Sequence, residues 1–236
     1  MLDVTFVDRA VALSPATLVV SDLHVGRADA ARVAAPLGER DDLHTRLDDA
    51  IDRTSPETVV FAGDVLHEFG RLSQRARDTL DDLVALCHDA GATPVAVAGN
   101  HDGMLDTAWD GPVHDRYRVD GGDRGTTVVC HGHDRPPAAD DVDLYVVGHD
   151  HPAITIEGQK RPSFLYGEDA YAGADLLMLP AFSRVAAGVV VNGLRSDDFQ
   201  SPLVTDVDSL RPVVWDSSTE EALWFPPLGR LRRLLG

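Results

Sequence analysis

Asp, Asn and His side chains follow five short apolar runs of this sequence, each at the point where the run ends. In the clearest case, the run Val95–Ala98 leads directly into the sequence G-N-H-D at residues 99–102. The other four runs, taken with their polar ends, are Thr17–His24, Thr58–Asp64, Thr127–His133 and Leu144–His151. A short apolar run stopped by glycine is typical of a buried strand that ends in a tight loop. Because buried polar atoms need partners, we expect the five polar ends to converge on one metal site.

The candidate ligands are mixed nitrogen and oxygen donors, and no thiolate is needed to complete the set. They are Asp22, His24, Asp64, Asn100, His101, His131, His149 and His151. Such a set suits Mn²⁺, Fe²⁺ or Zn²⁺ rather than Ca²⁺, which takes oxygen ligands only. A catalytic zinc ion uses about three protein ligands, so this set is too large for one ion. The donor types therefore predict two ions, with a carboxylate as the natural bridge between them.

An alternation of strands and helices is expected to position the first three polar ends. The expected strands are Thr17–Ser21, Thr58–Ala62 and Pro94–Ala98. Between them, apolar residues recur at helical spacing over Gly38–Arg53 and Ser73–Ala90, and Gly91 ends the second helix. This β-α-β-α-β order predicts parallel strands whose carboxyl ends carry the site at one edge of a sheet.

The second half of the chain is expected to be mainly antiparallel β, because helical periodicity becomes scarce after Asp102. The strand-like segments are Val113–Val119, Thr126–Cys130, Leu144–Val147, Ile154–Glu157, Ser163–Tyr166, Leu176–Leu179 and Ala187–Val191. With an opening hairpin of Val4–Val7 and Ala10–Leu13, they predict an α/β fold of four layers, an αββα sandwich in which two packed mixed sheets are flanked by helices.

We expect a single domain over residues 1–236, with residues 193–236 as a C-terminal extension that packs on it. No internal repeat, low-complexity segment or clear linker divides the chain. The last stretch of the extension is basic and apolar in an otherwise acidic protein. It has two interpretations, a short helix docked on its own domain or a contact for a partner.

The chain of 236 residues has a formal net charge of −18 at pH 7, and only seven of its 39 acidic residues are Glu. Lys160 is its only lysine. An Asp-rich, Lys-poor surface keeps a protein hydrated in concentrated salt, so we expect a halophilic source similar to a haloarchaeon. Repulsion of nucleic acid is the competing interpretation. At molar salt, however, the Debye length falls to about 3 Å, so the net charge does not exclude DNA or RNA as substrate.

Other features favour a cytoplasmic protein. Cys87 and Cys130 lie far apart and suit reduced thiols better than a disulfide framework. The N-terminus lacks a basic region followed by an apolar one, so no signal peptide is expected. No apolar run approaches the roughly 20 residues that span a bilayer, so we expect no membrane partner.

The five polar ends read D-L-H, G-D, G-N-H-D, H-G-H and G-H-D-H, and in this order they resemble the signature motifs of the calcineurin-like metallophosphoesterases. The motifs span Asp22 to His151, which is more than half of the chain. The resemblance implies a phosphoesterase that uses two divalent ions, Mn²⁺ foremost, with Fe²⁺, Zn²⁺ and Ni²⁺ as alternatives. Two cations about 3.5–4 Å apart produce a bridging hydroxide and hold both ends of an in-line displacement at phosphorus.

The resemblance also implies a role for each motif residue. The implied ligands of the first ion are Asp22, His24 and His151. The implied ligands of the second ion are Asn100, His131 and His149, with Asp64 bridging the two ions. His101 is implied to be catalytic rather than a ligand: it stabilises the phosphoryl group or protonates the leaving oxygen, and Asp102 orients it.

Three further segments, Gly63–Phe69, Gly148–Pro152 and Leu179–Phe182, resemble the small archaeal phosphoesterases related to the SbcD nuclease subunit. They are also similar to the bacterial ligase-associated phosphoesterases. The broader family carries Asp or Asn three residues after the bridging Asp, whereas this chain has His67. That histidine is a candidate contact for a metal-bound water or the substrate, with a supporting or helix-capping role as the alternative. His133, two residues after His131, is a second candidate near the substrate.

The resemblance favours phosphodiesters of nucleic acid or nucleotides as substrates, with DNA repair as a possible setting. The alternative enzyme is a small-molecule phosphomonoesterase or a cyclic-nucleotide phosphodiesterase. A scaffold that only binds partners is a third hypothesis, and the complete motif set argues against it. The sequence names no protein partner.

Overall fold

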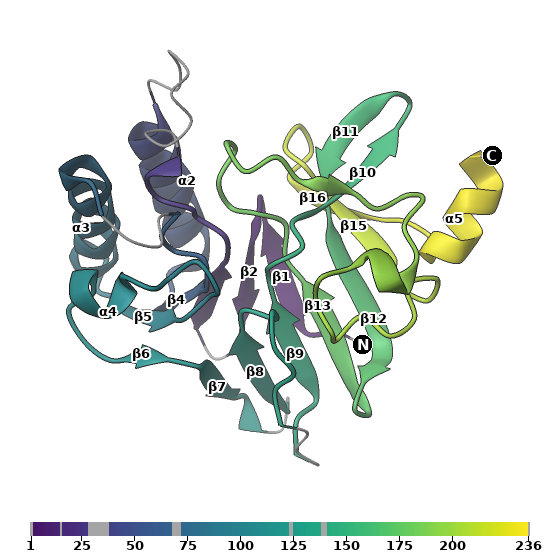
Figure 1. The fold of residues 1–236 in the computed structure, drawn as a ribbon, viewed down its shortest axis with the longest axis horizontal. Helices are drawn as coiled ribbons and strands as arrows, with labels where there is room; N and C mark the ends of the chain where they lie inside the picture. Colours follow the sequence, from purple (N-terminus) through teal and green to yellow (C-terminus); the bar gives the residue numbers. More distant parts are fainter. Residues whose placement is uncertain are drawn as a thin grey trace.

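The computed structural model describes residues 2–14, 16–27, 38–67, 72–122, 125–137 and 141–235. Two β-sheets form the middle of the molecule (Figure 1). Helices α2 (Glu39–Thr54) and α3 (Gln74–Asp89) lie on one side of them. The hairpin of β10 (Pro152–Ile156) and β11 (Gln159–Pro162) lies on the other side, with helix α5 (Leu228–Leu235).

The first sheet has six strands in the order β1-β2-β3-β4-β5-β6. Their bounds are Val4–Val7, Ala10–Leu13, Thr17–Val20, Thr58–Ala62, Thr93–Val97 and Val113–His114. Strands β1 to β3 pair antiparallel, whereas β3 to β6 pair parallel. The carboxyl ends of β3, β4 and β5 therefore meet at one edge, and a short helix, α4 (Leu105–Ala108), follows β5.

The second sheet has seven strands in the order β16-β15-β12-β13-β9-β8-β7. In that order their bounds are Glu221–Trp224, Arg211–Asp216, Phe164–Tyr171, Ala174–Met178, Leu144–Val147, Thr126–Cys130 and Arg116–Asp120. Strands β8, β9 and β13 are parallel neighbours at its centre. A small third sheet, β11-β10-β14, adds β14 (Val189–Val190) beside the β10–β11 hairpin.

The two long helices follow from the spacing of their apolar residues. In α2, Leu43, Leu47 and Ile51 recur every four residues and are buried against the first sheet. Helix α3 begins at Ser73, whose side-chain oxygen accepts a hydrogen bond from the backbone N–H of Ala76 at 3.1 Å. The predicted helices therefore match the observed ones to within one or two residues at each end.

Three apolar cores lie between the layers. One core joins the first sheet to α2 and α3, and a second lies on the outer face of the second sheet. The third core lies between the two sheets, where Val19 and Val60 of the first sheet share it with Val146 and Leu177 of the second. This packing confirms the predicted α/β fold with two stacked mixed sheets. The outer face of the second sheet is covered by α5, the small third sheet and the segment that follows the 3₁₀ turn η2 (Ser196–Asp198), from which Phe199 and Leu203 enter the outer core.

The C-terminal segments contribute to the second sheet and its outer core. Strands β15 and β16 extend the sheet beyond β12, and Leu228 and Leu231 of α5 are buried in the outer core. Strands β11, β15 and β16 were not predicted from the sequence, and Val113–Val119 was predicted as one strand. The structure divides that segment into β6 and β7, which belong to different sheets.

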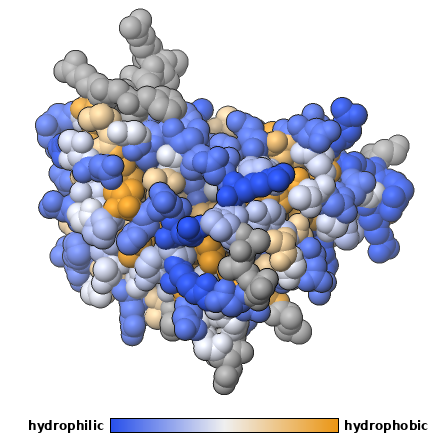
Figure 2. All heavy atoms as spheres, turned by 60° about the horizontal axis from the view of Figure 1, so that its bottom comes forward, coloured by the Kyte–Doolittle hydropathy of each residue, from blue (hydrophilic) through white to orange (hydrophobic). Residues whose placement is uncertain are grey.

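Hydrophilic side chains cover most of the face drawn in Figure 2, with small hydrophobic areas between them. This agrees with a chain whose formal net charge is −18. Among the described helices, none is long and apolar enough to cross a membrane.

Candidate metal centre

The loops after β3, β4, β5, β8 and β9 come together where the two sheets meet. The backbone N–H of Asp22 donates to Gly63 O at 3.0 Å, which joins the loops after β3 and β4. The N–H of Gly148 donates to His131 O at 3.0 Å, which joins the loops after β8 and β9. All five predicted polar ends thus lie at one edge, because each follows a parallel strand.

Asp22, His24 and His151 form the first of two groups of facing donor atoms, and we call it the first cluster. Their donor atoms all lie within 4.8 Å of one another. His24 Nε2 lies 3.2 Å from His151 Nε2, and His151 Nε2 lies 3.0 Å from Asp22 Oδ1. Asp22 and His24 are buried, whereas His151 is partly exposed.

Asp64, His131 and His149 form the second cluster, again with donor atoms within 4.8 Å of one another. His131 Nε2 is at its centre, 3.2 Å from His149 Nδ1 and 3.3 Å from Asp64 Oδ1. Asn100 belongs with them, since its Oδ1 lies 3.1 Å from the same nitrogen.

Asp64 faces both clusters. Its Oδ1 lies toward His131, as given above, and its Oδ2 lies 3.9 Å from His24 Nε2 in the first cluster. The structure therefore brings together all seven residues named as ligands from the sequence. Asp64 is a member of the second cluster, and its Oδ2 also faces the first cluster.

The backbone at this edge is strained. Five of the seven residues have positive φ angles, a conformation that side chains other than glycine rarely adopt. They are Asp22 (58°), His24 (49°), Asp64 (47°), His149 (76°) and His151 (47°). Neighbouring glycines allow the close packing, since a Cβ at Gly148 would overlap Ser21 and Asp22, and one at Gly99 would overlap Asp64. Strain of this kind concentrates at functional sites.

The buried charges of the two clusters act strongly on one another. Burial alone would raise the pKa of Asp64, but the hydrogen bond and charge of His131 and the backbone N–H of His101 hold that pKa well below its usual range. Burial opposes a charge on His131, yet Asp64 and Asp22 raise its pKa to about 9. Burial lowers the pKa of His24 to about 3.

The donors present fit two divalent cations. The facing ring nitrogens of His24 and His151, like those of His131 and His149, are 3.2 Å apart. His151 Nε2 and His131 Nε2 also face carboxylate oxygens of Asp22 and Asp64, and a single N–H on each ring nitrogen cannot serve every acceptor around it. Although His151 Nε2 lies 3.0 Å from it, the buried Asp22 Oδ1 accepts no hydrogen bond of acceptable geometry from the described residues. Mixed imidazole and carboxylate lone pairs that converge without enough protons are suited to a transition-metal ion or Zn²⁺.

His101 lies beside both clusters without belonging to either. Its backbone N–H donates to Asp64 Oδ1 at 2.9 Å, and its Nε2 lies 3.9 Å from Asp64 Oδ2. The side chain is 28% exposed, so solvent reaches it. This geometry lets the imidazole exchange a proton with a group bound over Asp64.

Asp102 is bonded to the backbone of two loops. Its carboxylate accepts hydrogen bonds from the N–H groups of Leu66 at 2.8 Å, Gly99 at 2.8 Å and Val65 at 3.2 Å. The sequence suggested that Asp102 orients the His101 side chain. The bonds seen here hold the loop that carries His101 against the loop that carries Asp64.

His67 and His133 flank the site on different sides. The His67 ring stacks on His101 with the ring centres 5.9 Å apart, and its centre lies 5.5 Å from that of His24. The His133 ring lies 5.3 Å from His131 and 6.1 Å from His149. Residues 68 and 69 of the motif that follows Asp64 lie outside the described residues.

Sequence reasoning missed Asp150, which lies between the two histidines of G-H-D-H. Its buried carboxylate accepts hydrogen bonds from the backbone N–H groups of Gln200 at 2.8 Å and Ser201 at 2.9 Å. It thus ties a segment 50 residues later in the chain to the loop of His149 and His151. Only its position inside the G-H-D-H motif could have indicated this role from the sequence, because Gln200 and Ser201 lie about 50 residues further along the chain.

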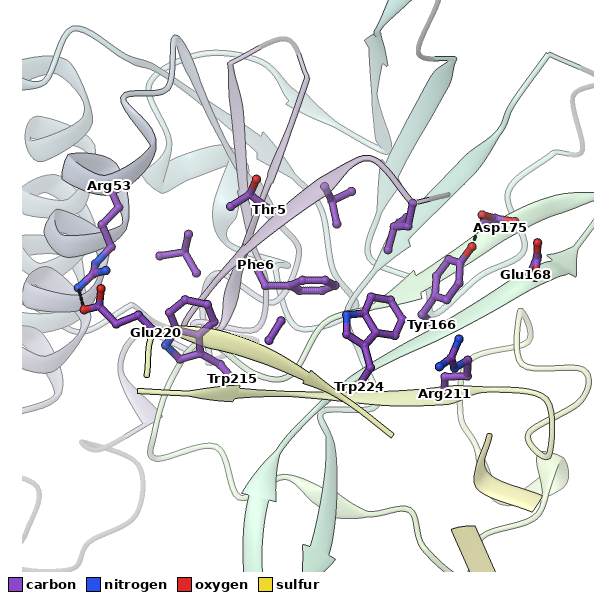
Figure 3. A pocket seen from close by; sticks show the side chains of 14 residues that line it. Thr5, Phe6, Arg53, Tyr166, Glu168, Asp175, Arg211, Trp215, Glu220 and Trp224 are labelled. Carbon is purple, nitrogen blue, oxygen red and sulfur yellow. Dashed lines mark hydrogen bonds and ion pairs between the residues drawn. The ribbon is translucent and has the colours of Figure 1, made fainter. Parts of the chain in front are cut away.

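A hollow of about 950 Å³ lies away from both clusters, between β1 and the outer strands of the second sheet (Figure 3). We call it the aromatic hollow, after Phe6, Tyr166, Trp215 and Trp224, which line it. Four of its polar side chains are paired with one another: Arg53 pairs with Glu220 at 2.6 Å, and the Tyr166 hydroxyl donates to Asp175 at 2.5 Å. None of its lining residues belongs to either cluster.

Comparison with known proteins gives one family match. The family model described as calcineurin-like phosphoesterase matches residues 16–141, which include the first four of the five polar ends. Among curated protein sequences, none matches this chain.

Several solved structures resemble this one. The nuclease MPE of Pseudomonas putida is 20% identical, with a TM-score of 0.59 over 88% of each chain. The phosphoesterase Yfce from E. coli is 14% identical, with a TM-score of 0.46 over 89% of this chain and 98% of that one. A dimetal phosphatase from Danio rerio is 12% identical, with a TM-score of 0.43 over 84% and 91%. The first likeness shows that the fold is shared.

Proposed function

The chain belongs to the calcineurin-like phosphoesterase family and is a metal-dependent hydrolase, and from this premise we propose that it cleaves phosphodiesters of nucleic acid or nucleotides. The observation that carries the proposal is the presence of two neighbouring clusters of donor atoms at one sheet edge, with Asp64 of the second cluster also facing the first. Two adjacent groups of three donors suit a two-ion site for displacement at phosphorus.

The proposed ligands of the first ion are Asp22, His24 and His151. The proposed ligands of the second ion are His131, His149 and Asn100, with Asp64 shared by both ions. When bound, the two cations would supply Lewis-acid polarisation of the phosphoryl oxygen and a nucleophile at neutral pH. The chain itself supplies a pre-formed set of ligands, of which Asp22, His24, Asp64 and His131 are buried. The strained loops and the close-packed glycines hold this set in place.

We propose that His101 handles the proton of the leaving oxygen. Its side chain is close to Asp64 but exposed enough to meet a substrate, and imidazole is the side chain most often used for proton transfer in catalysis. Asp102 acts as a positioning residue: by bonding to the N–H groups of Val65, Leu66 and Gly99, it fixes the separation of the loops that carry Asp64 and His101.

The choice of phosphodiesters rests on the resemblance of three segments to the SbcD-related phosphoesterases. The Pseudomonas putida protein that shares the fold is itself a nuclease, which is compatible with this choice. We further propose Mn²⁺ as the preferred ion, and we propose the cytoplasm of a halophile as the setting on the basis of the Asp-rich composition.

The test is a substrate panel measured after chelation and addition of a single metal at high salt. We expect Mn²⁺ to restore hydrolysis of bis-p-nitrophenyl phosphate and cleavage of single-stranded DNA or RNA. Hydrolysis of p-nitrophenyl phosphate alone would contradict the proposal and identify a phosphomonoesterase. Hydrolysis of cyclic nucleotides without cleavage of DNA or RNA would identify a cyclic-nucleotide phosphodiesterase instead.

A further inference from the structure

A separate hollow of about 410 Å³ borders the second cluster on one side. His131 and His133 line it together with Gly99 and Gly132, so it opens beside a proposed metal ligand. No residue of the first cluster lines it. A group bound there would therefore lie next to the place where both ions act, and not on it. We call it the arginine hollow, because Arg116 and Arg135 also line it.

Arg116 and Arg135, the two arginines of the hollow, are both exposed. Within the described ranges, neither forms an ion pair with a carboxylate, whereas several other arginines of this acidic chain do. Arg118 is the closest comparison, since it follows Arg116 by two residues on β7 and is also exposed. It pairs with Asp141 at 2.6 Å and does not line the hollow.

Two acidic residues also line the arginine hollow, and both are exposed. Asp134 lies 3.3 Å from His133 Nε2, and its side chain is 88% exposed. Asp115 precedes Arg116 at the start of β7. Among the described residues, neither carboxylate forms an ion pair with Arg116 or Arg135, so both guanidinium groups keep N–H donors available for an anion.

An unpaired arginine pair is suited to a phosphate, since guanidinium binds its oxygens with two parallel hydrogen bonds. In a chain with a net charge of −18, an anionic substrate needs a local cationic contact of this kind. The volume of the hollow falls within the range of about 300–1,000 Å³ that is usual for ligand pockets.

We propose that the arginine hollow is a subsite for a second phosphate of the substrate, the one next to the phosphate that is cleaved. The occupant is a single-stranded nucleic acid, whose neighbouring nucleotide supplies this phosphate. The inference rests on the proposed phosphodiesterase function and adds a reason for the protein to prefer a strand over an isolated diester.

The first test compares two substrates in the Mn²⁺-loaded protein. Bis-p-nitrophenyl phosphate has one phosphate, whereas a ten-residue oligothymidylate has a second phosphate beside each cleaved one. We expect Arg116→Gln combined with Arg135→Gln to lower the ratio of kcat/KM for the oligonucleotide to kcat/KM for bis-p-nitrophenyl phosphate by about tenfold or more. The matched control, Arg118→Gln, should leave this ratio within about twofold of that of the unaltered protein.

The second test measures binding without turnover. Fluorescein-labelled oligothymidylate is titrated into the Mn²⁺-loaded His101→Ala protein, with and without the two arginine substitutions, over a range of KCl concentrations. We expect the protein with the two arginine substitutions to bind the oligonucleotide about tenfold more weakly, or more weakly still, than the protein without them. The slope of log K against log [KCl] should also fall in magnitude by about 0.7, the value for one neutralised phosphate on a single strand. Unlabelled oligonucleotide should displace the probe, and displacement by ATP at least as strong would overturn the assignment to a strand.

The outcomes separate the two proposals. If the unaltered protein hydrolyses bis-p-nitrophenyl phosphate but the arginine double variant binds oligonucleotide as Arg118→Gln does, only the subsite is refuted. If no metal restores hydrolysis of any diester, the proposed function fails, while the binding titration still decides whether the arginines hold a phosphate. An unchanged melting temperature would show that the double variant is folded.

Discussion

The metal centre and the aromatic hollow differ in how their polar groups are satisfied. The aromatic hollow has a volume of about 950 Å³, yet Arg53 pairs with Glu220 in it and Arg211 lies over the Trp224 ring at 5.4 Å. The candidate metal centre holds residues with positive φ angles whose donor atoms face one another at hydrogen-bond distance. Converging donors on strained backbone, rather than cavity size, are the basis on which we propose these two clusters as the site of chemistry.

The largest expected effect comes from Asp64, because it faces both clusters. Asp64→Asn should reduce phosphodiester hydrolysis to the level of the metal-free protein, a loss larger than the about 10²–10⁴-fold that a proton-transfer residue contributes. Metal content measured by plasma emission spectroscopy should fall as well. The matched control is Asp49→Asn on the exposed side of α2, which should keep full activity and metal content. Equal activity of the two variants would contradict the shared role of Asp64.

His101→Ala should produce the next largest effect, a fall in kcat of about 10²–10⁴-fold with both ions still bound. The reason is that His101 lies beside the clusters and is not among their facing donors. A substrate with a leaving group of low pKa sharpens the test. Because p-nitrophenolate leaves without much protonation, hydrolysis of bis-p-nitrophenyl phosphate should be slowed less by His101→Ala than cleavage of a nucleic acid. Loss of an ion from the variant would contradict a purely catalytic role.

A smaller effect concerns pH and metal affinity. With its pKa at about 9, His131 is protonated at pH 7 in the metal-free protein, and a ligand must lose this proton. Burial lowers the pKa of His24 to about 3, and burial with the charge of His131 lowers that of His149 to about 4, so these rings are already neutral. Apparent Mn²⁺ affinity should therefore rise about tenfold per pH unit up to pH 9.

Isothermal titration calorimetry in buffers of different ionisation enthalpy measures the protons released on binding. About one proton per chain is expected at pH 7. No proton release, or an affinity independent of pH between 6.5 and 9, would refute the assignment of the charge to His131.

The smallest effect on activity is expected in the aromatic hollow. Trp224→Ala removes ring contacts with Phe6 at 5.8 Å and Tyr166 at 5.7 Å, so it should cost roughly 2 kcal/mol in the free energy of unfolding. Hydrolysis of bis-p-nitrophenyl phosphate should stay within about twofold. Urea denaturation and steady-state kinetics measure the two quantities. A large loss of activity in a stable variant would show that this region takes part in the reaction.

Much of the fold followed from local patterns. Strands β4, β8 and β9 have the bounds read from the sequence, because each is a short apolar run ended by turn residues or the polar site itself. Of the strands that were missed, β15 carries a short apolar run at residues 213–215 that the sequence prediction overlooked, whereas β11 lacks such a pattern. Strand β11 reads Q-K-R-P and is exposed throughout, so only its pairing with β10 defines it. Strands β15 and β16 are defined by pairing across the edge of the second sheet.

The site was more accessible to sequence reasoning than its supports were. The seven proposed ligands follow parallel strands, and parallel strands place their carboxyl ends together. The bonding of Asp102 and Asp150 depends instead on which loops meet, which no local pattern contains. We infer that residues 1–236 form one domain, because β15 and β16 complete the second sheet and Leu228 of α5 lies in its outer core.

Anomalous X-ray diffraction from crystals grown with Mn²⁺ tests the central claim most directly. The account predicts two peaks about 3.5–4 Å apart, one against the first cluster and one against the second, with Asp64 contacting both. The same crystals of Asp64→Asn should lose at least one peak. A single ion at this edge, or ions bound only elsewhere on the acidic surface, would contradict a two-metal phosphoesterase site.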